Sequence, residues 1–257
     1  KCLLRNFPDH IKGFEECERL HLKQNGIREI PNSILNFGKL RKLDLRNNEI
    51  SNLPQEFSLL KNLDELWIDN NKLKEFPLIL SNLVSLNYLW MDNNEIERIP
   101  SDCILPCIKS LSIENNRIKD LGGITKWKTL DTLLLNNNEI SEIPKQISLL
   151  KGLKKFRINT NKVERIANEI GDLENLVVLE LSNNRITSLP PTLAFLKKIE
   201  TWKVNNNPLQ SPPIEIGLKW TDLMGYMNDL LKGNQKCNFV KLIIVRKKKI
   251  KKRRIYF

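Results

Sequence analysis

Residues 176–198 read LVVLELSNNRITSLPPTLAFLKK, and this stretch indicates how the whole 257-residue chain folds. Three leucines among its first six residues have the spacing of a short strand whose alternate side chains point one way. Asn184 follows the last of these leucines by three residues. The apolar series from Ile186 to Leu196 then fits neither a long helix nor a hairpin. A unit of this size cannot bury its own apolar side chains, so it must stack on copies of itself.

The same unit recurs along the chain at intervals of 22 or 23 residues, which predicts a solenoid. The units begin at Cys17, Leu40, Leu63, Leu86, Ile108, Leu130, Leu153, Leu176 and Ile199. Their ninth residue is always asparagine: Asn25, Asn48, Asn71, Asn94, Asn116, Asn138, Asn161, Asn184 and Asn207. Because an amide side chain both donates and accepts hydrogen bonds, we expect a structural asparagine ladder that pairs backbone groups of neighbouring coils.

Proline closes the second apolar element of most units, at Pro31, Pro54, Pro77, Pro100, Pro144, Pro190 and Pro213. Gly122 and Ala167 take its place in two units. The fixed φ angle and the missing N–H of proline suit an extended or 3₁₀ return path and oppose a long helix.

These units resemble the leucine-rich repeat family, whose pattern LxxLxLxxN/CxL is matched by LRKLDLRNNEI, LDTLLLNNNEI and LVVLELSNNRI. The element I/L-P-x-x-I/L-x-x-L after each strand resembles the intracellular, Ras-associated class. The resemblance covers residues 1–218 and implies an α/β fold. This fold is a curved horseshoe with a parallel β-sheet on its concave face and short 3₁₀ or extended segments on its convex face. Residues 1–16 fit the second half of a further repeat without a polar capping unit, so we interpret the chain as a fragment.

The sequence changes character after the repeats. Residues 219–233 have apolar side chains at helical spacing, with Thr221 placed to cap the helix and Gly233 placed to end it. We expect an amphipathic capping helix that covers the open core of the last repeat, and a helix that docks a partner is the alternative. Residues 234–245, NQKCNFVKLIIV, predict a strand.

Three segments resemble the junction of Roco proteins: NPLQSPP at residues 207–213, the helix that contains YMNDLLKG at 226–233, and VKLIIV at 240–245. In that family the repeats lead into the first strand of a Ras-like GTPase domain (Roc). In that family a phosphate-binding loop, GxxxxGK[ST], would follow the strand. This chain has RKKKIKKRR at residues 246–254 instead, so we expect no GTP binding by the chain itself. The alternative interpretation is an N-terminal fragment of a Roco-type GTPase, truncated before its phosphate loop, whose parent protein binds GTP.

The basic tail, residues 246–257, carries most of the net charge of the chain. It contributes eight basic residues, and without them the net charge falls from +12 to +4. One interpretation is read-through beyond a domain boundary. The other is a nuclear-import signal, or a patch that binds nucleic acid or acidic membrane through residues 246–254.

No catalytic arrangement, cofactor motif or metal-ligand spacing is found in the sequence. The histidines are His10 and His21, and the cysteines are Cys2, Cys17, Cys103, Cys107 and Cys237. An odd number of cysteines without paired zinc-type spacing indicates a reduced, cytoplasmic compartment. Cys103 and Cys107 fall on the convex return path, where we expect one of them to face the core, and a regulatory disulfide is the alternative.

The residues that flank the buried leucines of each strand should lie on the concave face, because side chains alternate along a strand. In units three to six these residues are Glu65, Trp67, Asp69, Tyr88, Trp90, Asp92, Glu114 and Leu134. Stacking aligns Trp67 with Trp90 and forms an acidic column. Basic residues lie on both sides: Arg19, Lys23, Lys42 and Arg46 before it, and Lys155, Arg157 and Lys203 after it.

Exposed tryptophans beside fixed charges are typical of protein-binding hot spots, although scattered exposed residues are the alternative interpretation. We therefore predict a non-enzymatic protein-binding scaffold without cofactor. A cytoplasmic role in small-GTPase or kinase signalling follows from the family resemblance alone, and the basic tail leaves a nuclear location open.

Overall fold

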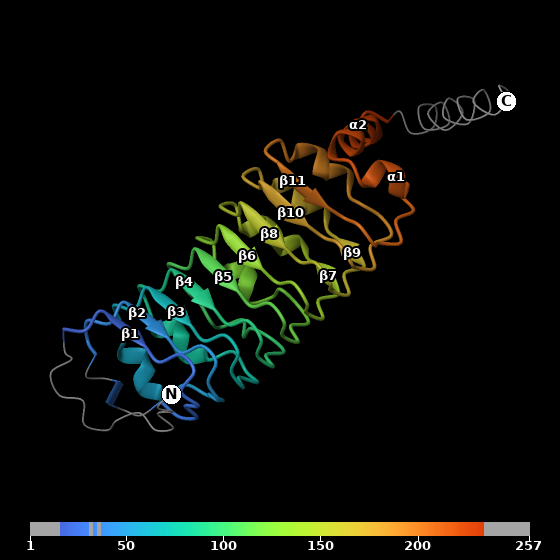
Figure 1. Ribbon diagram of the computed structural model, residues 1–257. Helices are drawn as coiled ribbons and strands as arrows, with labels where there is room; N and C mark the ends of the chain where they lie inside the picture. Colours follow the sequence, from blue (N-terminus) through green and yellow to red (C-terminus); the bar gives the residue numbers. More distant parts are fainter. Residues whose placement is uncertain (1–15, 31–32, 35–36, 234–257) are drawn as a thin grey trace, which may run out of the picture.

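The computed structural model describes residues 16–30, 33–34 and 37–233, which stack as successive coils of one elongated solenoid (Figure 1). The solenoid runs from β1 at one end to β11 and two short helices at the other. Most of the expected half repeat, the expected strand at 234–245 and the basic tail lie outside the described residues. Among the described residues, no helix combines the length and the apolar composition that crossing a membrane requires.

Nine parallel strands form one sheet in the order β1-β2-β3-β4-β5-β6-β8-β10-β11. Their bounds are β1 Arg19–His21, β2 Lys42–Asp44, β3 Glu65–Trp67, β4 Tyr88–Trp90, β5 Ser110–Ser112, β6 Thr132–Leu134, β8 Lys155–Arg157, β10 Val178–Glu180 and β11 Thr201–Lys203. Each strand begins two residues after the first residue of a unit, and each residue pairs with its equivalent one unit further on, as Leu43 does with Leu66. The predicted parallel sheet is confirmed.

Short 3₁₀ helices form most of the opposite side of the solenoid. They are η2 Gln55–Leu59, η3 Leu78–Asn82, η4 Ile124–Lys126, η5 Lys145–Leu149, η6 Asn168–Asp172 and η7 Pro191–Phe195. The five longer ones each follow a residue with extended backbone, which is Ala167 before η6 and proline before the other four. The predicted 3₁₀ return path is therefore confirmed. A two-stranded parallel sheet, β7 Glu142–Ile143 and β9 Arg165–Ile166, lies on the descending path of units six and seven.

The convex layer changes at the shorter units, which start at Leu86 and Ile108. Unit four has no 3₁₀ helix, and Cys103 stands there in the core position that Phe57 holds in unit two. The buried Trp127 of unit five packs beside Phe76, with ring centroids 5.8 Å apart. Its Nε1–H donates to the carbonyl of Cys103 at 2.9 Å. An indole from the next coil thus packs against the part of unit four that lacks a helix.

The two cysteines of unit four have opposite environments. Cys103 is fully buried and Cys107 is exposed, which confirms that one of them faces the core. Both thiols are free. Burial, and to a smaller extent the charge of Asp102, raises the pKa of Cys103 to about 12, so this thiol is neutral and unreactive at physiological pH.

Two helices, α1 Ile214–Gly217 and α2 Trp220–Leu231, cover the last coil. Trp202 of β11 takes the central position of its strand, which Phe156 holds in β8 and leucine holds in the other seven strands, and its Nε1–H donates to the carbonyl of Gly217 at 2.7 Å. Its ring also lies 5.1 Å from that of Trp220. Leu223 and Met227 are the buried residues of α2, so the helix covers the open core as expected.

The ends of α2 agree with the sequence in one respect and differ in another. Gly233 has a φ of 75°, and its N–H donates to the carbonyl of Leu230, so it ends the helix as expected. The predicted capping role of Thr221 is wrong. A capping side chain must precede the first helical residue, and that position is held by Lys219, which makes no side-chain cap.

Candidate functional site on the concave face

Eight buried asparagines connect the coils beside the sheet. In one example, Asn71 Nδ2 donates to the carbonyls of Leu45, in the preceding coil, and Ile68, in its own, both at 3.0 Å. Its Oδ1 accepts the N–H of Ile50 at 3.0 Å. The same pattern holds at Asn48, Asn94, Asn116, Asn138, Asn161, Asn184 and Asn207. For Asn25 the preceding coil lies outside the described residues. The Nδ2 of Asn25 donates to the carbonyl of Lys23.

The residue before each ladder asparagine has a positive φ, a feature that the sequence analysis missed. These residues are Gln24, Asn47, Asn70, Asn93, Asn115, Asn137, Thr160, Asn183 and Asn206, with φ between 54° and 62°. Asparagine tolerates this left-handed conformation better than most residues, which explains the recurrent Asn-Asn pair. Thr160 is the β-branched exception. The backbone next to the concave face is thus fixed at every coil.

An aromatic ledge, formed by Trp67, Tyr88 and Trp90, lies on β3 and β4. Trp67 pairs in register with Trp90, and their rings stack with centroids 5.0 Å apart and planes 7° from parallel. The ring of Tyr88 lies 6.0 Å from that of Trp90. Both tryptophans, which the sequence analysis expected to be exposed, are half-buried, because their rings stack on each other. Arg46 also covers Trp67, with its guanidinium carbon 5.8 Å from the ring centroid.

A carboxylate column, formed by Asp69, Asp92 and Glu114, runs beside the ledge. The backbone N–H of Asp92 donates to Asp69 Oδ1 at 2.8 Å, and that of Glu114 donates to Asp92 Oδ1 at 2.6 Å. Ser112 Oγ donates to Asp92 Oδ1 at 2.7 Å. The carboxylates of Asp69 and Asp92 therefore each accept a hydrogen bond from the backbone of the following coil, which fixes them in place.

Polar residues that the sequence analysis did not single out continue the column. Asn136 Nδ2 donates to Glu114 Oε1 at 2.6 Å, and Asn136 Oδ1 accepts the N–H of Asn159 at 2.8 Å. Asn159 Oδ1 accepts the N–H of Ser182 at 2.8 Å. The signal that could have found them is a polar side chain at the seventh position of each unit.

The carboxylate column has raised proton affinity. Burial raises the pKa of Asp69 from its ordinary 3.8 to about 6. Burial likewise raises the pKa of Asp92, and burial together with the charge of Asp92 raises that of Glu114. Three carboxyl groups that are partly removed from water, close to one another, disfavour their own ionisation.

Three other acids on the sheet have cationic partners. Asp44 accepts two hydrogen bonds from the guanidinium of Arg46 and one from its backbone N–H. Glu65 pairs with Lys42, and Glu180 pairs with both Lys203 and Arg157. Burial alone would raise the pKa of Asp44 and of Glu180, but these partners hold both pKa values below their ordinary range. Four of the flanking basic residues, Lys42, Arg46, Arg157 and Lys203, thus pair with acids of the sheet. The sequence analysis did not single out two of these acids, Asp44 and Glu180.

Leu134 lies half-buried on β6, in register with Ser112 on one side and Arg157 on the other. One strand, β5, therefore separates it from the aromatic ledge on β4. The structure brings the ledge and the column together on β3 to β5 and the loops that follow them, and it leaves Leu134 at their margin.

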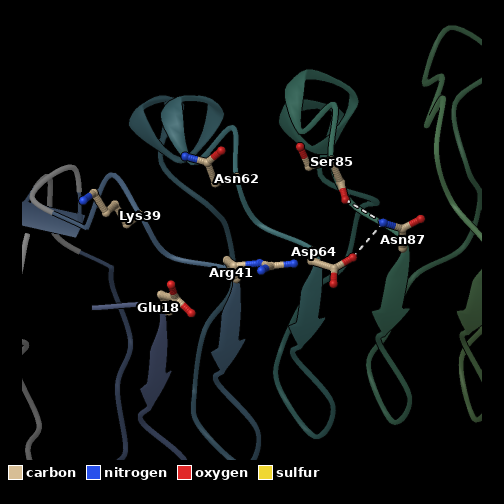
Figure 2. A pocket seen from close by; sticks show the side chains of 7 residues that line it. All are labelled: Glu18, Lys39, Arg41, Asn62, Asp64, Ser85 and Asn87. Atoms are coloured by element: carbon tan, nitrogen blue, oxygen red, sulfur yellow. Dashed lines mark hydrogen bonds between the residues drawn. The ribbon is translucent and has the colours of Figure 1, made fainter. Parts of the chain in front are cut away.

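A pocket of about 470 Å³ lies at the amino ends of β1 to β4 (Figure 2). Its lining comes from equivalent positions of four coils: Glu18, Lys39, Arg41, Asn62, Asp64, Ser85 and Asn87. Asn87 Nδ2 donates to Asp64 Oδ1 at 2.7 Å and to the carbonyl of Ser85 at 3.0 Å, which fixes one end of the pocket. Acids and bases alternate along it, so it selects no single ligand charge.

A larger, open groove of about 1350 Å³ lies on the descending side of units two to five. Pro77, Leu78 and Pro100 contribute apolar surface, whereas Glu97 and Lys119, also in its lining, form an ion pair of 2.6 Å. Within the part of the chain that the structure describes, no cluster of three or more histidine, cysteine or acidic side chains could hold a metal ion.

Comparison with known families and structures agrees with this architecture. Two family models, both described as leucine-rich repeat, match residues 15–73 and residues 175–196. A plant peptide hormone receptor, RGFR1 in complex with RGF2, has 24% identity and a TM-score of 0.66, over 79% of this chain and 34% of that one.

Two further solved structures show the same fold. The leucine-rich repeat protein LIC12759 of Leptospira interrogans has 26% identity and a TM-score of 0.62, over 79% of this chain and 59% of that one. The Arabidopsis receptor kinase HAESA, in complex with the peptide hormone IDA and the co-receptor SERK1, has 25% identity and a TM-score of 0.63. That match covers 74% of this chain and 34% of HAESA. This chain thus spans 34% to 59% of the length of the three structures.

Proposed function

We propose that this chain, a leucine-rich repeat protein by its fold and its sequence matches, is a non-enzymatic scaffold that binds a protein partner across units three to six. Leucine-rich repeat domains are generic protein-interaction scaffolds. The observation that carries the proposal is the stacked aromatic ledge of Trp67, Tyr88 and Trp90 on a rigid sheet. Large aromatic side chains at fixed positions are the usual centres of protein interfaces.

Rigid display is the mechanism of the proposed scaffold. The ledge is held by ring stacking, the column by backbone hydrogen bonds, and the strands by the asparagine ladder. Side chains that are ordered before binding lose little conformational entropy when a partner docks. RGFR1 and HAESA are named in complexes with peptide hormones, which supports a protein or peptide as the ligand class.

The test is capture of partners from cell lysate by the wild-type chain and by the double variant Trp67→Ala/Trp90→Ala. The matched control is Leu59→Ala/Leu149→Ala, which removes exposed apolar side chains from the convex layer instead. We expect proteins captured by the wild type to be lost by the double variant, by about tenfold or more, and retained by the control. Circular dichroism establishes that both variants are folded. Equal capture by all three chains would reject the concave site.

We further propose that the partner is a small GTPase or a kinase and that the chain acts in the cytoplasm. The support is the sequence resemblance to the Ras-associated class and, for the compartment, the free thiols of Cys17, Cys103 and Cys107. Sequencing of the captured proteins by mass spectrometry tests the partner class. Imaging of the tagged chain tests its location, and a nuclear signal lost on deletion of residues 246–257 would support the nuclear alternative.

We also propose, as the alternative, that the chain is an N-terminal fragment of a Roco-type GTPase. The support is the sequence that follows α2. An immunoblot with an antibody against the repeats measures the mass of the endogenous protein. A band much larger than 30.0 kDa would support a Roco-type parent, and GTP binding would then be tested on that parent. A band near 30.0 kDa would support a small scaffold.

Binding of nucleic acid or acidic membrane through residues 246–254 is a weaker proposal, supported by their charge alone. Binding of either one that falls steeply with salt and disappears on deletion of the segment would support it.

A further inference from the structure

The concave face carries two kinds of carboxylate. Asp44, Glu65 and Glu180 each have a lysine or arginine partner. The carboxylate column of Asp69, Asp92 and Glu114 has no such ion pair within the described residues, although basic side chains lie on both sides of it. Burial and hydrogen bonds without a cation in contact leave the column short of positive charge, because Arg46 and Arg157 act on Asp69 and Glu114 only from a distance.

We infer that the carboxylate column and the aromatic ledge together form a subsite for an arginine side chain of the bound partner. The inference rests on the proposed function and names the chemistry of one contact within it. The partner segment is basic at this point, because it supplies the charge that the column lacks. It is apolar on the neighbouring side, where Trp67 and Trp90 lie.

The chemistry of guanidinium fits both halves of the subsite. Its planar N–H groups donate to carboxylate oxygens, and its face stacks on an aromatic ring. The structure already contains this arrangement at the edge of the ledge. Arg46 donates to both oxygens of Asp44 and places its guanidinium carbon 5.8 Å from the centroid of Trp67. A partner arginine would make the same two kinds of contact, with an indole ring and a carboxylate, at Trp90 and Asp92. There the carboxylate follows the tryptophan in its own coil, whereas Asp44 pairs with Trp67 from the preceding strand.

Lysine fits the subsite less well. Its ammonium group is compact and strongly hydrated, so it is a poorer stacking partner for the ledge. A preference for arginine over lysine therefore distinguishes a preformed subsite from the general attraction of cations to an acidic surface.

The test is a titration of the full chain with N-acetyl-arginine methylamide, followed by the indole N–H signals of Trp67 and Trp90 in NMR spectra. The ligand controls are N-acetyl-citrulline methylamide, which keeps the shape without the charge, and N-acetyl-lysine methylamide. We expect saturable shifts at both indoles with arginine, and about fivefold weaker binding for each control, as expected for a partly exposed charged contact.

Two isosteric variants separate the column from the overall charge. Asp69→Asn/Asp92→Asn removes two charges from the column, and Glu18→Gln/Glu200→Gln removes two from exposed positions at the amino ends of β1 and β11. We expect about fivefold weaker arginine binding for the first variant and no change for the second. Both are folded if their remaining indole signals keep the wild-type positions.

Three results would each overturn the inference: no saturable binding of arginine, equal binding of arginine and citrulline, or equal weakening in both variants. Equal binding of lysine would overturn the choice of arginine. If any of these occurs while Trp67→Ala/Trp90→Ala still abolishes partner capture, the concave scaffold stands and only the arginine subsite is rejected.

Discussion

Trp67 and Trp90, which are 23 residues apart in sequence, stack with ring centroids 5.0 Å apart and planes 7° from parallel. Each ring occupies a position of its strand that faces the concave surface rather than the core. The two rings therefore stabilise the fold through each other, and neither can be substituted without changing the surface of its neighbour.

This stacking predicts an energetic coupling between the two residues. We expect the variants Trp67→Leu, Trp90→Leu and the double variant to show a coupling free energy of about 1 kcal/mol in urea unfolding. The control cycle combines Trp67→Leu with Val178→Ala on the distant β10. In this cycle the two losses of unfolding free energy should be additive. Additive losses in the tryptophan cycle would contradict the stacked arrangement.

The pKa of Asp69 predicts a change of stability with pH. Because its pKa is about 6 in the fold and 3.8 in its ordinary state, the folded chain binds a proton more tightly than the unfolded chain. This carboxyl therefore favours the fold below about pH 4, and its contribution falls as the pH rises to about 6, by up to about 3 kcal/mol. In urea unfolding, the free energy of unfolding of Asp69→Asn should therefore rise by that amount relative to the wild type between about pH 4 and about pH 6.

Asp44→Asn is the control of opposite sign. Arg46 holds the pKa of Asp44 below its ordinary value, so its carboxylate stabilises the fold at neutral pH and this contribution is lost as the pH falls. We expect Asp44→Asn to be least stable relative to the wild type at neutral pH. A free-energy difference between wild type and Asp69→Asn that stays constant with pH would reject the buried, unpaired state of Asp69.

Thr160 has a φ of 55°, in a row where seven of the other eight residues are asparagine. A β-branched residue is strained in this conformation, which asparagine adopts more readily. We expect Thr160→Asn to raise the free energy of unfolding by about 1 kcal/mol, and Asn137→Thr, one coil earlier, to lower it by a similar amount. Thermal unfolding of both variants checks the pair, and a neutral Thr160→Asn would contradict the strain.

Gly123 predicts a steric effect that its neighbour does not share. A Cβ atom at Gly123 would lie 2.5 Å from the carbonyl oxygen of Ile99 and 2.8 Å from that of Pro100. A Cβ at Gly122 would meet a side-chain oxygen of Asp120, which can move, at 3.0 Å. We expect Gly123→Ala to cost about 2 kcal/mol in urea unfolding and Gly122→Ala less than half of that. Equal losses would mean that the two coils do not approach so closely.

The repeat spacing predicted the sheet, the 3₁₀ return path and the capping helix, because units that cannot bury their own apolar residues must stack in register. The same spacing aligned Trp67 with Trp90. Whether these residues bind a partner stays a prediction.

Interactions between coils account for what the sequence did not predict. The pairing of Glu180 with Arg157 and Lys203 depends on side-chain reach between coils, and the half-burial of the tryptophans depends on how their rings turn toward each other. The position of Trp127 depends on a neighbouring coil that lacks its helix. Such properties arise from contacts between units and not from the pattern within one unit.

The eight buried ladder asparagines each form hydrogen bonds with the coil before them, and this direction affects how the chain folds during its synthesis. Asn71 completes the hydrogen bonding of Leu45 and Ile50, which belong to the coil before it. Eight coils in succession depend in this way on the ninth residue of the unit that follows. A nascent coil leaving the ribosome is therefore unfinished until part of its successor has emerged, and folding follows translation with a lag of about one repeat.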